Sequence, residues 1–218
     1  MKERIDVGRL LERKASNQAS NSDASNQVQR VSSRLPKTGK QSLLEAANSK
    51  SLHKDLTIEL VRNLVEDYLE EEWDQYIPGS LESNRIWIHN YANIEDHPDK
   101  FRIYATNDYM KKYGNRFDDI EVYYRASSSR RWIAELRLFL SICFEYDSNT
   151  SRSFELALIR NYRNLGPDSK MDSISLELES NEDEIYTVID IANIERRVFV
   201  VPDFAHEDKK FYLCDVYF

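Results

Sequence analysis

The stretch Trp132–Tyr146, WIAELRLFLSICFEY, holds the pattern that decides the fold. Its apolar side chains recur at every second position: Trp132, Ala134, Leu136, Leu138, Leu140, Ile142 and Phe144. Glu135, Arg137 and Ser141 stand between them, and this period of two is typical of a β-strand with one face against a core. Ile133, Phe139 and Cys143 interrupt the polar face. We therefore expect a long strand, buried in part on both sides and bent so that it serves two sheets.

Shorter stretches of the same kind, rich in aromatic and β-branched residues and separated by polar turns, lie on both sides of this one. They are Arg85–Tyr91, Phe101–Thr106, Ile120–Tyr124, Phe154–Tyr162, Ile174–Leu178, Ile185–Ile191, Val198–Val201 and Phe211–Phe218. No helical pattern of about ten residues separates them, which argues against a doubly wound α/β fold. The sequence therefore predicts a mainly β domain over residues 80–218, built as a small antiparallel barrel or sandwich.

A helical pattern precedes the strands, in the segment 51–79. Between Leu56 and Tyr76 apolar residues recur at steps of three and four, acidic residues occupy the other side, and Pro78-Gly79 follows. The stripe covers only about three heptads, so we expect an amphipathic helix that packs on the chain's own core. A coiled coil or a partner-binding helix is the alternative.

Residues 1–50 are predicted to form a disordered, basic tail. From Ala15 to Lys40 only Val28, Val31 and Leu35 are sizeable apolar side chains, too few to offset the entropy lost on ordering. Residues 1–55 carry 11 Lys and Arg against 6 Asp and Glu, whereas residues 56–218 carry 19 against 32. Because nucleic-acid binding depends on clustered basic residues, the tail is the expected contact if nucleic acid is bound. A solvated linker is the other interpretation of the tail.

Composition limits the class of protein. The 218 residues, of which 41% are hydrophobic and 11% aromatic, can build one good core. No apolar run reaches the roughly 18 residues of a membrane-spanning helix, and the N-terminal MKERID does not resemble a secretory signal. Cys143 and Cys214 are too few for a disulfide scaffold. We expect an intracellular protein without membrane contact.

The residue types needed for common catalytic sites are present but not arranged for them. The four histidines fall in separate segments and the two cysteines are far apart, so no zinc site is expected. The five glycines form neither G-x-G-x-x-G nor a P-loop, and no serine lies in a G-x-S-x-G elbow. We therefore expect no metal, no cofactor and no catalytic residue, and interpret the chain as a protein that is not an enzyme.

Four carboxylates keep a nuclease interpretation open. Asp118, Asp119, Asp190 and Glu195 lie near the predicted strand ends, where acidic side chains of neighbouring strands could hold Mg²⁺ ions. An RNase H-like core would also need helices after its strands, and residues 80–218 show no such pattern. The alternative for these acids is a turn or strand-end position.

Aromatic residues suggest a binding site instead. The 13 tyrosines, 9 phenylalanines and 3 tryptophans exceed what a small core needs. Five of them lie near predicted strand ends, where they could form a cleft that holds a methylated lysine by cation–π attraction: Tyr123, Tyr124, Trp132, Tyr162 and Tyr186. Cross-strand packing of half-buried aromatics is the alternative.

Four stretches also carry a resemblance to a known family: RFDDIEVYY, WIAELRLFLSICFEY, FELALIRNY and YTVIDIANIERRVFVVPDF. They resemble the C-terminal region of proteins encoded by fungal Plavaka-type (CACTA-like) DNA transposons, and the likeness covers roughly residues 100–218. In that region an Arg-x-Asp precedes a strand, an apolar strand and an Ala-Leu-Val/Ile strand follow, and an Ile-x-x-Ile-x-Arg stretch leads to Val-Pro. The matching residues here are Arg116, Asp118, Leu138–Ser141, Ala157–Ile159, Ile191, Ile194, Arg196, Val201 and Pro202.

The chain departs from the family at two places. Phe199-Val200 replaces the usual His-Leu before the proline, and Phe211–Cys214 replaces the terminal Tyr-Val-Asn strand. The catalytic acids of that family do not lie in its C-terminal region. The resemblance therefore implies an accessory or interaction domain.

A second resemblance is to the bromo-adjacent homology (BAH) domains of chromatin proteins. Those β-barrels run through an Ile-x-x-(Lys/Arg)-x-x-Val strand to a Phe-Phe/Tyr-x-Cys strand, much as Ile194–Val200 leads to Phe211–Cys214 here. Together the two resemblances imply a BAH-like or SH3-like barrel. They imply a non-catalytic module of mobile-element origin that binds a protein or peptide, in the nucleus and near chromatin. A transposase or nuclease fragment, inactive or metal-dependent, and nucleic-acid binding by the tail remain the alternatives.

Overall fold

Strands dominate the computed structural model, which describes residues 32–37, 40–49, 52–96, 99–107, 115–123, 132–147, 150–168, 173–181, 184–204 and 210–214. The early strands are β1 (Ser32–Arg34), β2 (Gln41–Ser42), β3 (Ile86–His89), β4 (Tyr91–Asp96), β5 (Asp99–Thr106), β6 (Arg116–Phe117) and β7 (Asp119–Val122). The later ones are β8 (Trp132–Asp147), β9 (Thr150–Asp168), β10 (Ser173–Leu178), β11 (Tyr186–Asp190), β12 (Ile194–Pro202) and β13 (Lys210–Cys214). Two α-helices, α2 (Leu43–Asn48) and α3 (Ile58–Glu72), and two 3₁₀ turns, η2 (Ser83–Arg85) and η3 (Ile191–Asn193), accompany them. The predicted mainly β fold is confirmed.

Six of the strands form a closed ring of antiparallel pairs. β7 pairs with β8, β8 with β9, β9 with β10, β10 with β13, β13 with β12, and β12 again with β7. β3 and β2 extend the sheet from β8, and β11 extends it from β9. A second sheet has the order β1-β4-β5-β6. The strand series predicted from the sequence is therefore a small barrel with lateral extensions.

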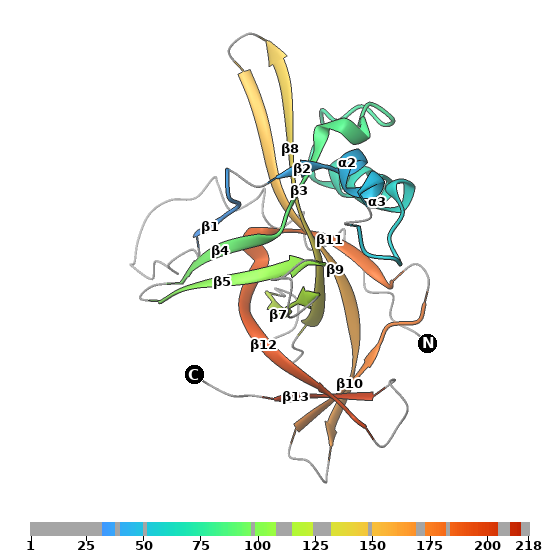
Figure 1. Ribbon diagram of the computed structural model, residues 1–218, viewed down its shortest axis with the longest axis vertical. Helices are drawn as coiled ribbons and strands as arrows, with labels where there is room; N and C mark the ends of the chain where they lie inside the picture. The colour runs from blue at the N-terminus through green and yellow to red at the C-terminus, as the bar shows by residue number, and fades with distance from the viewer. Residues whose placement is uncertain are drawn as a thin grey trace.

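The hairpin of β8 and β9 is the backbone of the fold, because each of its strands serves several neighbours. It runs along most of the molecule, with the helices beside its upper half and β10 and β13 crossing below (Figure 1). Leu136 pairs with Ile159 but Leu138 with Leu158, so Arg137 is the extra residue of a β-bulge. The long bent strand that the alternation predicts is confirmed, and the bulge is where its two halves join.

Three apolar clusters fill the interior. One lies between the helices and the β3–β8–β9 face, a second between β4–β5 and the opposite face of β7–β8–β9, and a third inside the strand ring. The members of the third, Ile133, Leu176, Val198 and Leu213, come from four of the ring strands. This small third cluster occupies only part of the ring interior, whose remainder holds charged side chains.

Helix α3 packs on the first cluster, as its apolar stripe predicts. Val61, Val65 and Leu69 are fully buried against it. The side chain of Thr57 accepts the backbone N–H of Leu60 at 3.1 Å, which caps the first turn. Neither helix in the described part of the chain has the length and apolar character needed to cross a bilayer.

Two sequence-based boundaries are wrong. The stretch Arg85–Tyr91, predicted as one strand, is divided at Asn90 because Ile88 pairs with Leu140 in one sheet and Tyr91 with Tyr104 in the other. Which sheet each half joins depends on distant partners, and no local pattern encodes it.

The second wrong boundary is the end of the predicted tail. Residues 1–31 lie outside the described part of the chain, but residues 32–37 and 40–49 belong to the fold. Leu35, Leu43 and Ala46 are buried in two of the apolar clusters, and a capping box between Ser42 and Glu45 begins α2. These few apolar residues are ordered because the neighbouring strands supply the core that they lack by themselves.

Candidate functional site

The structure places the described residues of the predicted aromatic cleft in different surroundings. Trp132 packs against the second apolar cluster, Tyr162 against the third and Tyr186 against the first. Tyr123 is 54% exposed at the end of β7, and Tyr124 lies outside the described residues. Three of the five therefore pack in separate clusters, because nearness to a strand end does not determine which face of a sheet a side chain occupies.

Trp132 is anchored by hydrogen bonds rather than left open to a ligand. Its indole N–H donates to Asn161 Oδ1 at 3.1 Å, and Asn161 Nδ2 donates to Thr187 Oγ1 at 2.8 Å. These bonds link β8, β9 and β11. Trp132 therefore has a structural role that its position in the sequence does not reveal.

Tyr162 and Tyr186 meet a cluster of charged residues that no sequence pattern indicates. Asp119 of β7 lies opposite Glu135 of β8, which lies opposite Arg160 of β9, which lies opposite Tyr186 of β11. The hydroxyl of Tyr162 donates to Asp119 Oδ1 at 3.1 Å. We call Asp119, Glu135, Arg160, Tyr162 and Tyr186, together with Arg137 and His53, the charged row.

Arg137, the bulge residue, is the central cation of the charged row and is only 4% exposed. Its Nη2 lies 2.7 Å from Glu135 Oε2, and its Nη1 donates to His53 Nε2 at 3.1 Å. The guanidinium also lies over the ring of Phe117, 5.4 Å from its centroid. Since His53 precedes α3, Arg137 joins the helical layer to the strand ring.

Burial changes the protonation of the charged row. Burial and the neighbouring charge of Glu135 raise the pKa of Asp119 to about 7. Burial raises the pKa of Glu135, Tyr162 and Tyr186 as well. The pKa of His53 is lowered by burial and by the charge of Arg137, so its imidazole is neutral and accepts from the arginine.

The carboxylates of the nuclease alternative serve separate contacts. Asp118 accepts from Arg116 Nε at 3.0 Å and from the backbone N–H of Tyr104 at 2.9 Å. Asp190 caps η3 by accepting the N–H of Ala192 at 2.7 Å, at the far end of β11 from Tyr186. In the described ranges, no three His, Cys, Asp or Glu side chains are grouped so that they could hold a metal ion.

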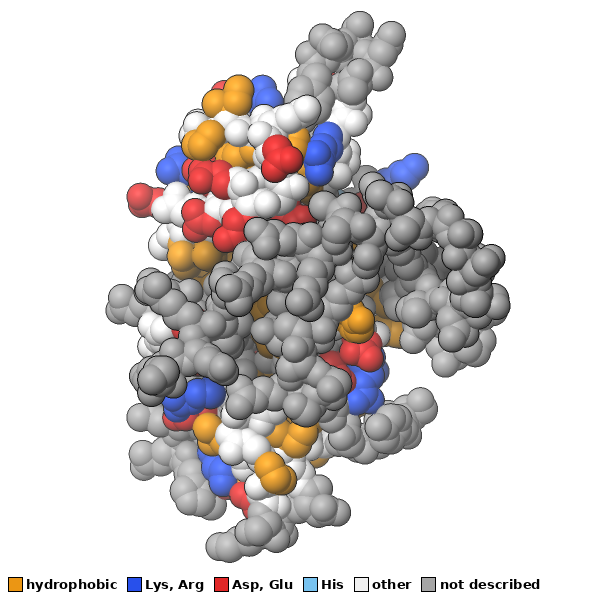
Figure 2. Space-filling view, turned by 180° about the vertical axis from the view of Figure 1, so that it is seen from behind, with side chains coloured by type: hydrophobic (Ala, Val, Ile, Leu, Met, Phe, Trp, Pro, Cys, Tyr) orange, Lys and Arg blue, Asp and Glu red, His pale blue; other side chains and the backbone are white. Residues whose placement is uncertain are grey.

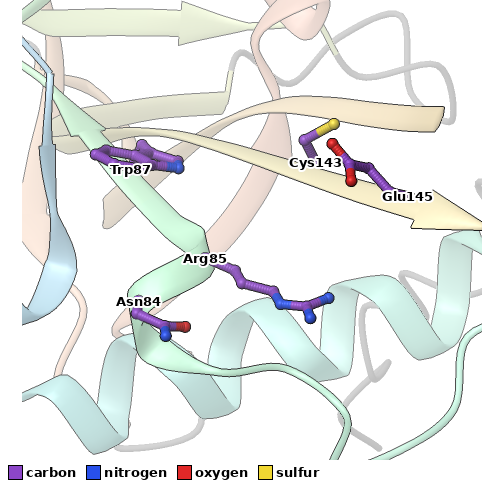
Figure 3. Close-up of a pocket in the computed structure, with 5 residues that line it drawn as sticks. All are labelled: Asn84, Arg85, Trp87, Cys143 and Glu145. Carbon is purple, nitrogen blue, oxygen red and sulfur yellow. The ribbon is translucent and has the colours of Figure 1, made fainter. Parts of the chain in front are cut away.

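An open groove of about 460 Å³ lies beside β3 and β8, lined by Asn84, Arg85, Trp87, Cys143 and Glu145 (Figure 3). Trp87 lies opposite Ser141, and Cys143 and Glu145 follow Ser141 at two-residue steps, so all point away from the apolar core. Cys143 and Glu145 are exposed, and Trp87 is half-buried. We call this site the Trp87 groove.

The aromatic face of the groove already holds a cation. Lys40 Nζ lies over the ring of Trp87, 4.4 Å from its centroid. Glu145, across the groove, forms no hydrogen bond or ion pair with another described residue. The groove thus combines an aromatic ring and an open carboxylate, the two groups that attract an organic cation.

Sequence reasoning missed Trp87, although a signal for it exists. In RIWIHNY the residues Ile86 and Ile88 alternate with Trp87 and His89. Because the two isoleucines are buried in the core, the tryptophan between them must lie on the opposite face. A large aromatic residue on the polar face of a strand is a better indication of a binding site than nearness to a strand end.

A second exposed apolar surface lies on β12. Phe199 and Val201 are each 41% exposed on its outer face, and Arg197 lies over the ring of Phe199 at 5.3 Å. Hydrophobic side chains lie beside Lys or Arg at the lower end of the molecule, where β10 and β13 are found (Figure 2).

Comparison with protein-family models, with curated proteins and with solved structures found no match to this chain. Its function is therefore inferred from the geometry of the molecule itself.

Proposed function

We propose that the chain is a non-catalytic protein-interaction module, of mobile-element origin, that binds a basic segment of a protein partner in the Trp87 groove. The observation that carries the proposal is the contact between Lys40 and Trp87, with Nζ 4.4 Å from the ring centroid. A ring that accepts the chain's own ammonium group can accept one from a partner, since tryptophan is the side chain best suited to cation–π attraction.

The unpaired carboxylate of Glu145 favours the same ligand. A lysine or arginine that enters beside Trp87 would meet Glu145 on the neighbouring strand. Lys40 is exposed, so a partner side chain can displace it or stack on the free part of the ring. The ligand is therefore a basic side chain of a peptide.

The charge of the body supports a basic partner. Residues 56–218 carry 32 acidic against 19 basic side chains. Asp and Glu side chains lie over the upper part of the molecule, where the helices are found (Figure 2), and α3 passes below the groove (Figure 3). Such a field raises the association rate of a positively charged partner.

The proposal also includes a biological setting, namely an origin in a mobile element and a role in the nucleus near chromatin. The mobile-element origin is supported by the resemblance of residues 100–218 to the Plavaka-type C-terminal region. A nuclear, chromatin-associated role agrees with the basic partner, and the basic tail would supply any contact with nucleic acid.

Peptide binding by the full chain tests the proposal. Arrays of basic peptides, with lysines unmodified and trimethylated, would provide a ligand whose dissociation constant is then measured by calorimetry. We expect Trp87→Ala to weaken binding about 2- to 30-fold, the range of a cation–π contact, and Glu145→Gln to weaken it less.

Matched variants locate the contact. Tyr123→Ala removes an exposed aromatic side chain at a distant strand end and should leave the affinity unchanged. If Phe199→Ser abolishes binding while Trp87→Ala does not, the partner uses the β12 face and the groove assignment is wrong. If no peptide binds above background, the proposal of a peptide-binding module is refuted.

A nuclease fragment has less support, because Asp118, Asp119 and Asp190 have separate partners. Mg²⁺-dependent cleavage of DNA by the full chain, abolished by Asp190→Asn, would nevertheless favour it over a binding module.

A further inference from the structure

The closure of the strand ring depends on its shortest member. β7 has four residues, Asp119–Val122, and pairs with β8 on one side and β12 on the other. Without β7 the ring would be open between those two strands. Whatever weakens the pairing of β7 therefore opens the barrel.

Two carboxyl groups face each other at the first pair of β7. Asp119 lies directly opposite Glu135, and like charges in opposite positions of an antiparallel pair destabilise it. Neither group is free to turn to solvent, because Asp119 is held by the hydroxyl of Tyr162 and Glu135 by the guanidinium of Arg137.

Among the described residues, the groups around Asp119 do not supply it with a cation of its own. From β8 it faces Glu135, from β9 the hydroxyl of Tyr162, and from β12 the backbone N–H of Val200. On its own segment, Asp118 is already paired with Arg116. The remaining charged groups nearby act mainly on Glu135 or pair with each other: Arg137, Arg160, Asp55, His53, and the Arg196–Glu121 pair.

The two carboxyl groups therefore differ in how well their ionised forms are stabilised. Arg137 and Arg160 lower the pKa of Glu135 against the effect of burial, which favours its ionised form. Burial and Glu135 act in the same direction on Asp119 and raise its pKa to about 7. At pH values below this, the proton resides on Asp119.

We propose that Asp119 is a proton-operated lock on the barrel: when protonated it keeps β7 paired between β8 and β12, and when ionised it repels Glu135 and releases β7. The proposal is independent of what the Trp87 groove binds. It assigns a conformational role to a residue that the sequence suggests as a nuclease acid or as a turn residue.

The direction of the pH effect follows from proton linkage. The folded protein keeps a proton on Asp119 at a pH where the unfolded chain has lost it, so the folded state is favoured at low pH. This contribution is lost as the pH rises from the usual aspartate range through about 7. β7 should thus open more often in mildly alkaline than in mildly acidic solution.

Hydrogen exchange of the full chain, corrected for the intrinsic exchange rate, tests the lock. Between about pH 6 and about pH 8.5 we expect the protection of the β7 amides to fall by about tenfold, because it falls about tenfold for each pH unit below the pKa of about 7 and levels off above it. The amides of α3, which lies outside the ring, are the internal control. In Asp119→Asn, which keeps the shape and cannot ionise, the fall should disappear.

A second variant keeps the test decisive if Asp119→Asn does not fold. Tyr162→Phe removes the hydrogen bond that favours the ionised form of Asp119, so the midpoint of the pH dependence should move to higher pH. If β7 protection in the wild type does not change with pH, or changes equally in Asp119→Asn, the lock is refuted. An unmoved midpoint in Tyr162→Phe would assign the pH dependence to another group.

Discussion

The two halves of the β8–β9 hairpin are stabilised by different forces. Beneath α3 the hairpin presents an apolar face, on which Leu140, Ile142 and Leu156 are almost fully buried. Beyond the Arg137 bulge the same two strands present Glu135, Arg160 and Tyr162 to the inside of the ring. Apolar burial has no dependence on protonation, whereas a buried charge network is stable only while its charges balance. The stability of the apolar half should therefore not depend on the protonation of the hairpin's side chains, whereas the stability of the charged half should.

The largest expected effect comes from unbalancing the charged half. Arg137→Met removes the buried cation that is ion-paired with the half-buried Glu135, although Arg160 stays opposite it, and breaking a buried ion pair on one side costs about 3–5 kcal/mol. Denaturant unfolding measures this free energy. The double variant Glu135→Leu with Arg137→Met removes both charges and should recover most of the loss. A single variant as stable as the wild type would show that the network contributes nothing.

The apolar half should respond almost as strongly, but to a change of volume. Leu69→Ala in α3 removes a fully buried side chain and should lower the free energy of unfolding by about 2–5 kcal/mol. Ile77→Ala, at a position 71% exposed, is the control and should change it by less than about 0.5 kcal/mol. The loss in Leu69→Ala should be the same at every pH, and a pH-dependent loss would contradict the division into two halves.

His89 tests whether pH sensitivity belongs to the ring alone. It is 3% exposed, shares a 2.8 Å hydrogen bond with Ser141, and burial lowers its pKa to about 4. A histidine kept neutral in the fold stabilises at high pH, and this contribution is lost as the pH falls below about 6.5. Between about pH 7 and pH 5 the loss should be about 2 kcal/mol. Thermal unfolding of His89→Gln should lack this component, and an unchanged pH profile would contradict it.

Asp119 should change the stability less than His89 does, and in the opposite direction, because its contribution is lost as the pH rises. From about pH 6 to pH 8 the free energy of unfolding should fall by about 1 kcal/mol, since its pKa of about 7 lies in the middle of that interval. Denaturant midpoints of the wild type and Asp119→Asn, measured across the interval, give the difference. Parallel profiles of the two proteins would assign the dependence to other groups.

Most of the elements could be predicted from the sequence, because each is encoded by a local pattern. The alternation in Trp132–Phe144 predicts β8, and the stripe from Leu56 to Tyr76 predicts α3, with the Thr57 cap and Pro78-Gly79 near its ends. The division of Arg85–Tyr91 could not be predicted. Its two halves are equally good strands, and only their distant partners separate them.

The candidate sites could be predicted only in part. The sequence predicts Tyr162 and Tyr186 as aromatic groups for a ligand, yet both lie among the side chains of the charged row, where the Tyr162 hydroxyl donates to Asp119. Trp87 could have been found from its alternation with Ile86 and Ile88. The burial of Arg137 could not be predicted. It depends on a β-bulge in β8, which arises from the register in which β8 pairs with β9.

The sequence by itself determined where strands and the long helix form, which side chains enter a core, and that the body is acidic, since these follow from periodicity and composition. Tertiary structure decided which strands close the ring, that Asp119 faces Glu135, and that Trp87 and Glu145 share one groove. The physical reason is that register and bulges are set by pairing between residues far apart in the chain. Their energies depend on the whole sheet rather than on any neighbouring residues.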